Sequence, residues 1–180
     1  MKRFIILLRG INVSGKNKLQ MADLRELLND LNFQNIQTYI QSGNIILDTE
    51  KSKNKVCEHI KKGIADKFGY NIHVLARTLF EWERAIAKYP FPIENPKIVA
   101  FVFLDKKTSE TKIEAIGVND DKYKIDNDVV YIYCPAGFAR TKLSNNLFER
   151  KLKVAATTRN YKTTMKLLQL AKDHTIIQKL

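Results

Sequence analysis

The sequence lacks the features that mark secreted and membrane-spanning proteins. Only two cysteines, Cys57 and Cys134, occur among its 180 residues, and they lie far apart without a CxxC pattern. The longest apolar runs are Phe4–Leu8, Ile98–Leu104 and Val129–Cys134. Each is far shorter than the roughly 20 residues that a bilayer-spanning helix needs. These absences exclude a disulfide scaffold, and we expect a cytoplasmic protein with no membrane partner.

Catalytic and metal-binding patterns are also scarce. The three histidines, His59, His73 and His174, show no metal-ligand spacing with one another or with the cysteines. No G-x-S-x-G nucleophile elbow occurs. We therefore expect no metal and no cofactor, and we favour a binding protein over an enzyme.

Positive charge is what the sequence has in excess. It contains 31 Lys and Arg residues against 19 Asp and Glu, a net charge of +12. Residues 1–20 contain five basic side chains and no acidic one, and residues 140–166 contain eight basic side chains and one acidic one. If these two regions meet in space, they create a positive field that attracts phosphates or nucleic acid. A basic surface with no anionic partner is the alternative.

Hydrophobic periodicity predicts an α+β fold. Over residues 1–77 the order is strand, helix, hairpin, helix, strand, which is the ferredoxin-like order with an antiparallel sheet and both helices on one face. The expected elements are a strand at Phe4–Leu8, a helix with an apolar stripe from Met21 to Leu31, a hairpin of Ile36–Ile40 and Ile45–Leu47, a helix from Val56 to Phe68 that Gly69 caps, and a strand at Ile72–Ala76.

A similar order follows in the second part of the chain. The expected elements are a strand at Ile98–Leu104, a short helix at Glu110–Ile116, a hairpin of Tyr123–Ile125 and Val129–Cys134, and helices at Ser144–Leu152 and Asn160–Lys172. We therefore predict two tandem ferredoxin-like (βαββαβ-type) halves, residues 1–77 and 97–180, packed together. A connecting helix and a Pro-rich turn over residues 78–96 join them.

The segment Gly10–Asn17 nearly matches the phosphate-binding loop G-x-x-x-x-G-K-[ST], and it follows an apolar strand. Asn17 stands at the hydroxyl position and is a poor magnesium ligand. A phosphate-loop fold also needs a parallel sheet, whereas the predicted hairpin indicates an antiparallel one. We therefore disfavour nucleotide hydrolysis. A looser anion-binding nest and a purely structural turn both stay open.

A second polar segment, Gln41–Asn44, joins the two strands of the first hairpin. It is typical of a tight turn in which Gly43 supplies a positive φ and Asn44 bonds to its own backbone. The alternative is a polar tip that is presented to a ligand.

The third segment, residues 137–166, has two basic side chains, Arg140 and Lys142, in one loop. Thr157 or Thr158 is expected to cap the last helix, beside Arg159. A helix N-terminus next to an arginine favours binding of an anion. The alternative is that the threonine only caps the helix and that water solvates the arginine. Aromatic residues also interleave with basic ones in this part of the chain and could stack nucleic-acid bases if they are exposed on a sheet, although aromatic strand residues are usually core. They are Tyr131, Tyr133, Phe138 and Tyr161.

Four segments together resemble the domain-of-unknown-function family 1697. They are Leu8–Val13, Thr38–Asn44, Arg140–Asn145 and Ala156–Tyr161. The resemblance extends over the whole chain, and it implies a bacterial cytosolic protein with a duplicated ferredoxin-like fold and no established activity. The chain departs from the family pattern at Ser14, Thr141 and Tyr161, where the family has Gly, Ser and Trp.

Our leading hypothesis is a binding protein with a basic groove between the halves. The ligand would be a phosphate-bearing small molecule or nucleic acid. An enzyme that acts on a phosphorylated small molecule is the first alternative, with Lys16, Arg9 and Arg159 as electrostatic clamps. A structural or protein-interaction module without a ligand is the second. The candidate ligand-binding residues are Arg9, Asn12, Lys16, Gln41, Asn44, Lys142, Arg159 and Asn160.

Overall fold

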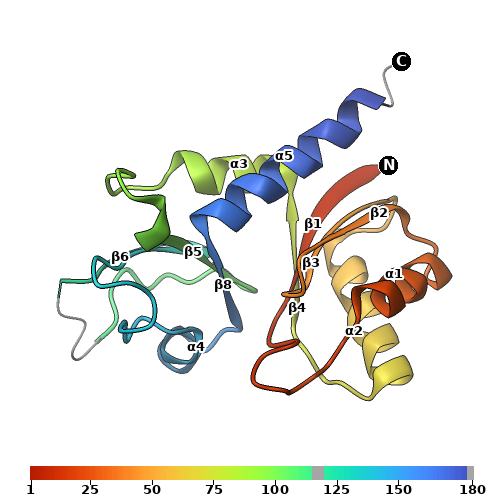
Figure 1. Ribbon diagram of the computed structural model, residues 1–180, viewed down its shortest axis with the longest axis horizontal. Helices are drawn as coiled ribbons and strands as arrows, with labels where there is room; N and C mark the ends of the chain where they lie inside the picture. The colour runs from red at the N-terminus through yellow and green to blue at the C-terminus, as the bar shows by residue number, and fades with distance from the viewer. Residues whose placement is uncertain (115–119, 178–180) are drawn as a thin grey trace. The chain divides into compact units, whose positions relative to one another are not determined.

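The protein folds around two four-stranded antiparallel sheets (Figure 1). The computed structural model describes residues 1–114 and 120–177. The chain divides into two compact units, which we describe separately. The first unit contains Met1–Arg84 and Leu167–Leu180, and the second contains Ala85–Lys166. The boundaries expected from the sequence did not place the end of the chain in the first unit.

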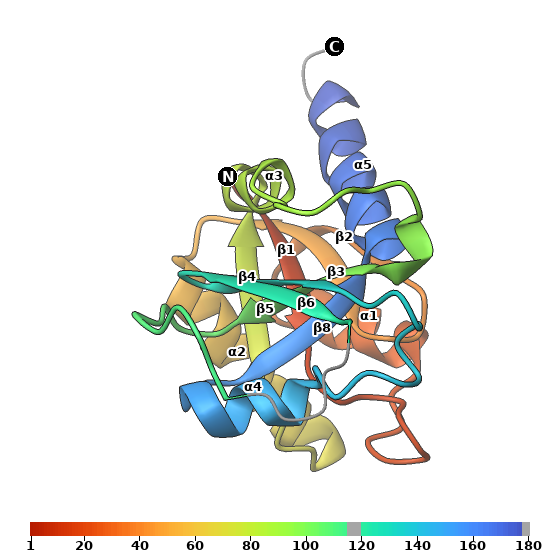
Figure 2. The same cartoon turned by 90° about the vertical axis from the view of Figure 1, so that its left-hand side faces the viewer.

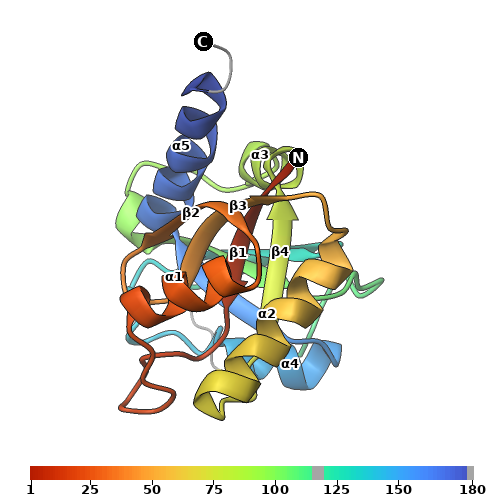
Figure 3. The same ribbon diagram turned by 90° about the vertical axis from the view of Figure 1, so that its right-hand side faces the viewer.

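The first unit has the strand and helix order that periodicity predicts. Its sheet has the order β2-β3-β1-β4. Helices α1 and α2 lie on the same face of that sheet (Figure 3). The elements are β1 (Lys2–Leu8), α1 (Met21–Asp30), β2 (Gln34–Tyr39), β3 (Asn44–Thr49), α2 (Lys53–Phe68) and β4 (Val74–Thr78), and α3 (Leu79–Ala87) follows.

The core of the first unit forms between this sheet and its two helices. Alternate residues of β1, Phe4, Ile6 and Leu8, enter the core because successive strand side chains point to opposite faces. The apolar stripes of α1 and α2 complete it. Gly69 ends α2 in the left-handed conformation, with φ +73°, as the sequence predicts.

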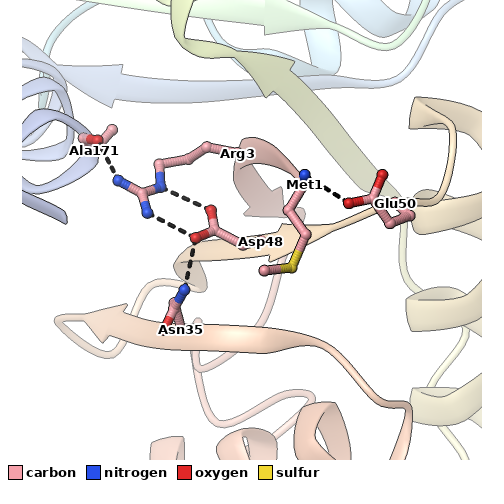
Figure 4. Close-up of polar contacts among 6 residues, drawn as sticks. All are labelled: Met1, Arg3, Asn35, Asp48, Glu50 and Ala171. Atoms are coloured by element: carbon pink, nitrogen blue, oxygen red, sulfur yellow. Dashed lines mark hydrogen bonds and ion pairs between the residues drawn. The ribbon is translucent and has the colours of Figure 1, made fainter. Parts of the chain in front are cut away.

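The end of the long helix α5 (Tyr161–Ile177) belongs to the first unit, where a buried ion pair holds it. Arg3 donates from Nε and Nη2 to the two oxygens of Asp48, each over 2.7 Å, and from Nη1 to the backbone carbonyl of Ala171 over 2.9 Å (Figure 4). Asn35 donates to the same carboxylate over 2.8 Å. One arginine therefore links β1, β3 and α5.

The second unit repeats the strand order of the first. Its sheet runs β6-β7-β5-β8, and α4 lies beside β8 (Figure 2). The elements are a 3-10 turn at Pro96–Ile98, β5 (Val99–Leu104), β6 (Lys122–Asp126), β7 (Val129–Tyr133), α4 (Asn145–Leu152) and β8 (Ala156–Asn160). Alternate residues of β5, Ala100, Val102 and Leu104, pack with Phe148 of α4 in the core.

Two sequence predictions for the second unit need correction. The expected helix at Glu110–Ile116 is absent over residues 110–114, and the rest of it lies outside the described residues. The hydroxyl of Tyr123 bonds to the backbone N–H and the carbonyl of Ile113, over 3.1 and 2.7 Å, which occupies both groups that a helix would use. Strand β8 was not predicted, and its pairing with β5 completes the sheet.

No helix in the described ranges, 1–114 and 120–177, combines the length and the apolar character that crossing a bilayer requires.

Candidate anion-binding site

A basic pocket of about 310 Å³ lies in the second unit, beside the start of α4. Three cationic side chains and one carboxylate line it together with two polar residues and one apolar residue. The lining residues are Lys142, Arg150, Lys151, Glu114, Ser144, Asn146 and Leu147.

Local structure explains why these side chains gather. Ser144 caps α4, because its Oγ accepts a hydrogen bond from the N–H of Leu147 over 3.3 Å. Residues four apart lie on the same face of a helix, so Arg150 follows Asn146 and Lys151 follows Leu147 along the pocket wall. Lys142 comes from the loop just before the cap.

The electrostatics of this pocket favour an anion. Its lining has three positive charges and one negative charge. Glu114 lies 3.3 Å from the Nζ of Lys151, which leaves Lys142 and Arg150 as the cations that the pocket carboxylate does not pair. The first turn of α4 adds a partial positive charge from its backbone N–H groups.

Two backbone N–H groups of the glycine-bearing loop in the first unit, and one side chain, donate to carbonyls of the same loop. The N–H of Asn12 donates to the carbonyl of Asn17 over 3.2 Å, and the N–H of Lys16 donates to the carbonyl of Val13 over 3.0 Å. Asn17 donates from Nδ2 to the carbonyl of Gly10 over 3.0 Å. These N–H groups are engaged within the loop, and the flanking strand β1 pairs only with antiparallel neighbours in the described sheet. This geometry favours the structural turn over the phosphate nest.

The structure brings Asn12 and Gln41 together. The amide of Asn12 donates to the carbonyls of Gln41 and Leu19, over 2.8 and 2.9 Å, and its oxygen accepts from the N–H of Leu19 over 2.8 Å. Asn12 therefore links the β1–α1 loop to the β2–β3 turn. The side chain of Lys16 is exposed, and Arg9 is half-buried.

Asn44 stabilises the turn rather than facing a ligand. Its side chain is fully buried and donates to the carbonyl of Tyr39 and to Oγ of Ser42, over 3.0 and 2.9 Å. Gly43 has φ +73°, as expected, and a Cβ on it would lie 2.6 Å from that of Leu8. Both findings agree with a tight turn.

The tail segment is also more structural than the sequence suggests. Arg159 is only 7% exposed and donates to Oγ1 of Thr157 and to the carbonyl of Thr158, over 2.7 and 2.9 Å. The cap of α5 is Asn160, whose Oδ1 accepts from the N–H of Thr163 over 2.8 Å. The expected threonine caps were wrong because Thr157 and Thr158 lie in β8.

Tyr131 and Tyr133 do not offer a free platform for stacking bases. Tyr131 is buried, and its ring centroid lies 5.8 Å from that of Tyr89 and 5.9 Å from that of Phe101. Tyr133 packs against Phe91 at 6.1 Å. Residues of the segment after α3 therefore pack on the face where bases would stack.

Thiol and metal chemistry find little support in the described structure. Burial raises the pKa of the Cys134 thiol to about 11 and also raises the pKa of Cys57, so both thiols stay protonated at neutral pH. Within residues 1–114 and 120–177, no group of three or more His, Cys, Asp or Glu side chains is arranged to hold a metal ion.

The eight residues expected from the sequence therefore separate into several places. Lys142 lines the pocket, whereas Asn44, Arg159 and Asn160 have structural contacts. Sequence reasoning missed Arg150 and Lys151, although their spacing of four from Asn146 and Leu147 on a predicted helix could have indicated them.

These features define an α+β protein with two antiparallel sheets and a basic pocket beside α4. The family model "Protein of unknown function (DUF1697)" matches residues 1–131, and the chain belongs to this family. The signature segments Leu8–Val13 and Thr38–Asn44 lie inside the match, and those after residue 131 lie beyond it.

Among solved structures, the conserved bacterial protein SP0830 from Streptococcus pneumoniae is similar to this chain. The two are 25% identical with a TM-score of 0.68, over 94% of this chain and 98% of that one. No curated protein shows significant similarity to the chain.

Proposed function

We propose that this protein binds a phosphate-bearing small molecule in the pocket beside α4. The observation that carries the proposal is the gathering of Lys142, Arg150 and Lys151 around one concave site. Arginine and lysine are the side chains that recognise phosphate, and charge-assisted hydrogen bonds make such contacts strong. We assign the activity to the cytoplasm, where phosphorylated metabolites are abundant.

The size and the lining of the pocket narrow the ligand class. A volume of about 310 Å³ is at the small end of the range for ligand sites, which suits a sugar phosphate or a mononucleotide. Glu114 would accept hydrogen bonds from ligand hydroxyl groups, while Lys142 and Arg150 contact the phosphate. Long nucleic acid is less favoured, since the aromatic face of the sheet is covered by Tyr89.

We further propose that each unit is a ferredoxin-like half of a duplicated chain. The strand orders β2-β3-β1-β4 and β6-β7-β5-β8 correspond position by position. Arg77 of β4 pairs with Ile5, and Arg159 of β8 pairs with Phe101, so an arginine occupies the same place in both sheets. Each arginine is followed by the residue that caps the next helix, Thr78 or Asn160.

A thermal-shift titration tests the ligand proposal. The probes are inorganic phosphate, ribose 5-phosphate, AMP and a short RNA oligonucleotide at one fixed moderate salt concentration. A ligand at about 100 times its Kd adds about 2.7 kcal/mol of stability. At this chain length that amount raises Tm by about 5–10 °C.

Three variants separate the pocket from general basicity. Lys142→Ala and Arg150→Ala should abolish the shift without unfolding the protein, because both side chains lie at the surface of the pocket. Lys107→Ala is the matched control, since it removes an exposed cation of the same unit outside the pocket. No shift with any probe, or an equal loss of shift in the control, refutes the proposal. Turnover of ribose 5-phosphate would instead identify an enzyme.

A further inference from the structure

Ile40, in the turn between β2 and β3, has a strained backbone conformation and an apolar side chain that is exposed to solvent. Its φ is +49°, and 50% of the residue is exposed. The described residues include eight non-glycine residues with positive φ, of which Ile40 is the only β-branched one. A left-handed β-branched residue is a true outlier, and such strain persists where the surroundings impose it and function uses it. Folding alone would favour Asn or Gly here.

A second exposed aliphatic side chain lies on the adjoining loop. Val13 is 58% exposed and begins a tight turn, closed by the bond from the Lys16 N–H to its carbonyl. Asn12 holds this loop to the β2–β3 turn through its 2.8 Å bond to the Gln41 carbonyl. Val13 and Ile40 are thus the chain neighbours of the two residues that this bond joins. We call residues 10–19 with residues 40–43 the loop pair. The β1–α1 part of it runs below the sheet of the first unit in Figure 1.

The loop that contains Val13 is cationic. Lys16 and Lys18 are both exposed, and residues 1–22 contain no acidic side chain. The loop pair therefore contains two exposed aliphatic residues and two exposed lysines, on backbone that the Asn12 bond holds together. A partner that fits the loop pair has an apolar region that buries aliphatic side chains and negative charge that attracts lysines.

Lipid surfaces satisfy this combination better than proteins or nucleic acid do. Energetically important residues of protein interfaces are enriched in Trp, Tyr and Arg, whereas Lys is depleted there and Val is under-represented. Nucleic acid would attract the lysines, but its phosphate backbone offers no apolar surface that would bury Val13 and Ile40. An anionic bilayer attracts lysines at its headgroups and accepts aliphatic side chains at its acyl boundary.

We propose that the loop pair docks this protein onto an anionic lipid surface. Val13 and Ile40 enter the interface, and Lys16 and Lys18 contact the headgroups. Docking on the surface needs no membrane-spanning helix, so it replaces the expectation from the sequence that no membrane is a partner. The proposal goes beyond the phosphate pocket, which lies in the other unit and uses other residues.

Vesicle co-sedimentation of the full chain tests the proposal. The vesicles contain equal amounts of phosphatidylglycerol and phosphatidylcholine, and vesicles of phosphatidylcholine alone are the reference. We expect binding to the anionic vesicles that weakens as salt rises, and much weaker binding to the reference. Absence of binding to the anionic vesicles, or equal binding to both, overturns the proposal.

Matched variants separate the loop pair from general stickiness and charge. The double variant Val13→Ser/Ile40→Asn should lower the partition coefficient at least ten-fold, and it should fold because Asn tolerates a positive φ. Phe80→Ser is its control, since Phe80 is 73% exposed on α3 of the same unit and should have no effect. Retained binding in the double variant, or an equal loss in the control, overturns the proposal.

Two pairs of lysine variants test the contribution of charge. Lys16→Gln/Lys18→Gln should weaken binding by about five-fold for each lysine removed. Lys61→Gln/Lys62→Gln removes two exposed lysines from α2 and should change binding less than two-fold. An equal effect of the two pairs would mean that net charge alone drives binding, and it would overturn the assignment to the loop pair.

Discussion

Replacing Asp48 by Asn tests whether the Arg3–Asp48 pair stabilises the first unit. The pair is bidentate at 2.7 Å, and the side chains of Arg3 and Asp48 are only 11% and 4% exposed. In Asp48→Asn the guanidinium keeps its charge but loses the carboxylate that neutralises it. Breaking a buried pair from one side costs about 3–5 kcal/mol. Because the Asn oxygen still accepts one hydrogen bond and Arg3 keeps its bond to Ala171, we expect about 3 kcal/mol.

Urea unfolding followed by circular dichroism measures this loss directly. A loss of about 3 kcal/mol lowers Tm by about 6–12 °C at this chain length. The double variant Arg3→Met/Asp48→Leu should recover a large part of it, because no orphan charge stays buried. Hydrogen exchange near Ala171 should become faster in the double variant, because Arg3→Met removes the donor to the Ala171 carbonyl.

An exposed ion pair of the same length provides the control. Lys67 and Glu26 also approach to 2.7 Å, but the Glu26 side chain is 67% exposed. Glu26→Gln should leave Tm unchanged within error, since solvent screens such pairs. If Asp48→Asn is as stable as wild type, or if both variants lose equal stability, the reasoning from burial is refuted.

Three further predictions concern single residues of the first unit. Gly43→Ala should lower the free energy of unfolding by about 2–4 kcal/mol in urea titration, because its Cβ would lie 2.6 Å from that of Leu8 at φ +73°; a change below about 1 kcal/mol would contradict this. Ile40→Asn should raise Tm by about 2–4 °C in calorimetry, since it relieves a strain of about 1 kcal/mol; a lower Tm would argue against strain at this residue. Burial raises the pKa of Glu81, but its hydrogen bond from Lys53 and other contacts outweigh burial and lower the pKa below 4.5. A lowered pKa means that the stabilisation is present above pH 4.5 and lost as the pH falls through the folded value. Glu81→Gln should therefore flatten the acid side of the stability profile, and an unchanged profile would refute this.

The sequence predicted the first unit well because its signals are local and strong. The apolar run Phe4–Leu8 is buried at every residue, and the helical stripe that ends at Phe68 packs one helix face on the core. Gly43 and Gly69 mark turns whose positive φ few other residues adopt. Pattern and local conformation agree at these positions, so the element order could be derived without tertiary information.

Strand β8 shows what local signals cannot supply. Its sequence, Ala156–Asn160, is mostly polar and has no strand periodicity. It becomes a strand because every residue pairs with β5, from Ala156 with Leu104 to Asn160 with Ala100. The edge strand β8 therefore depends on a partner strand that is far away in the sequence. Taken locally, the two threonines before Arg159 are typical of a helix cap.

The candidate site was harder to predict because sequence patterns do not show burial. Asn44 and Arg159 are polar, as ligand-binding residues often are, but both form hydrogen bonds within the protein. Lys142 was correctly placed in a polar loop, but only the fold brings it to the same pocket as Arg150. Whether a polar side chain serves the fold or a ligand is therefore decided by its partners.

The strained Ile40 of the loop pair contrasts with the well-satisfied polar groups of the rest of the described structure. Among the described residues, no buried side-chain nitrogen or oxygen lacks a hydrogen-bond partner. A fold that satisfies its polar groups so fully has no need of a strained isoleucine at its surface, since Asn would relieve the backbone and remove the exposed apolar area. If Ile40→Asn raises Tm and weakens vesicle binding in the same protein, the cost of the strain and its use are measured at one residue. A variant that gains stability and keeps full binding would separate the two and leave the strain without a role in docking.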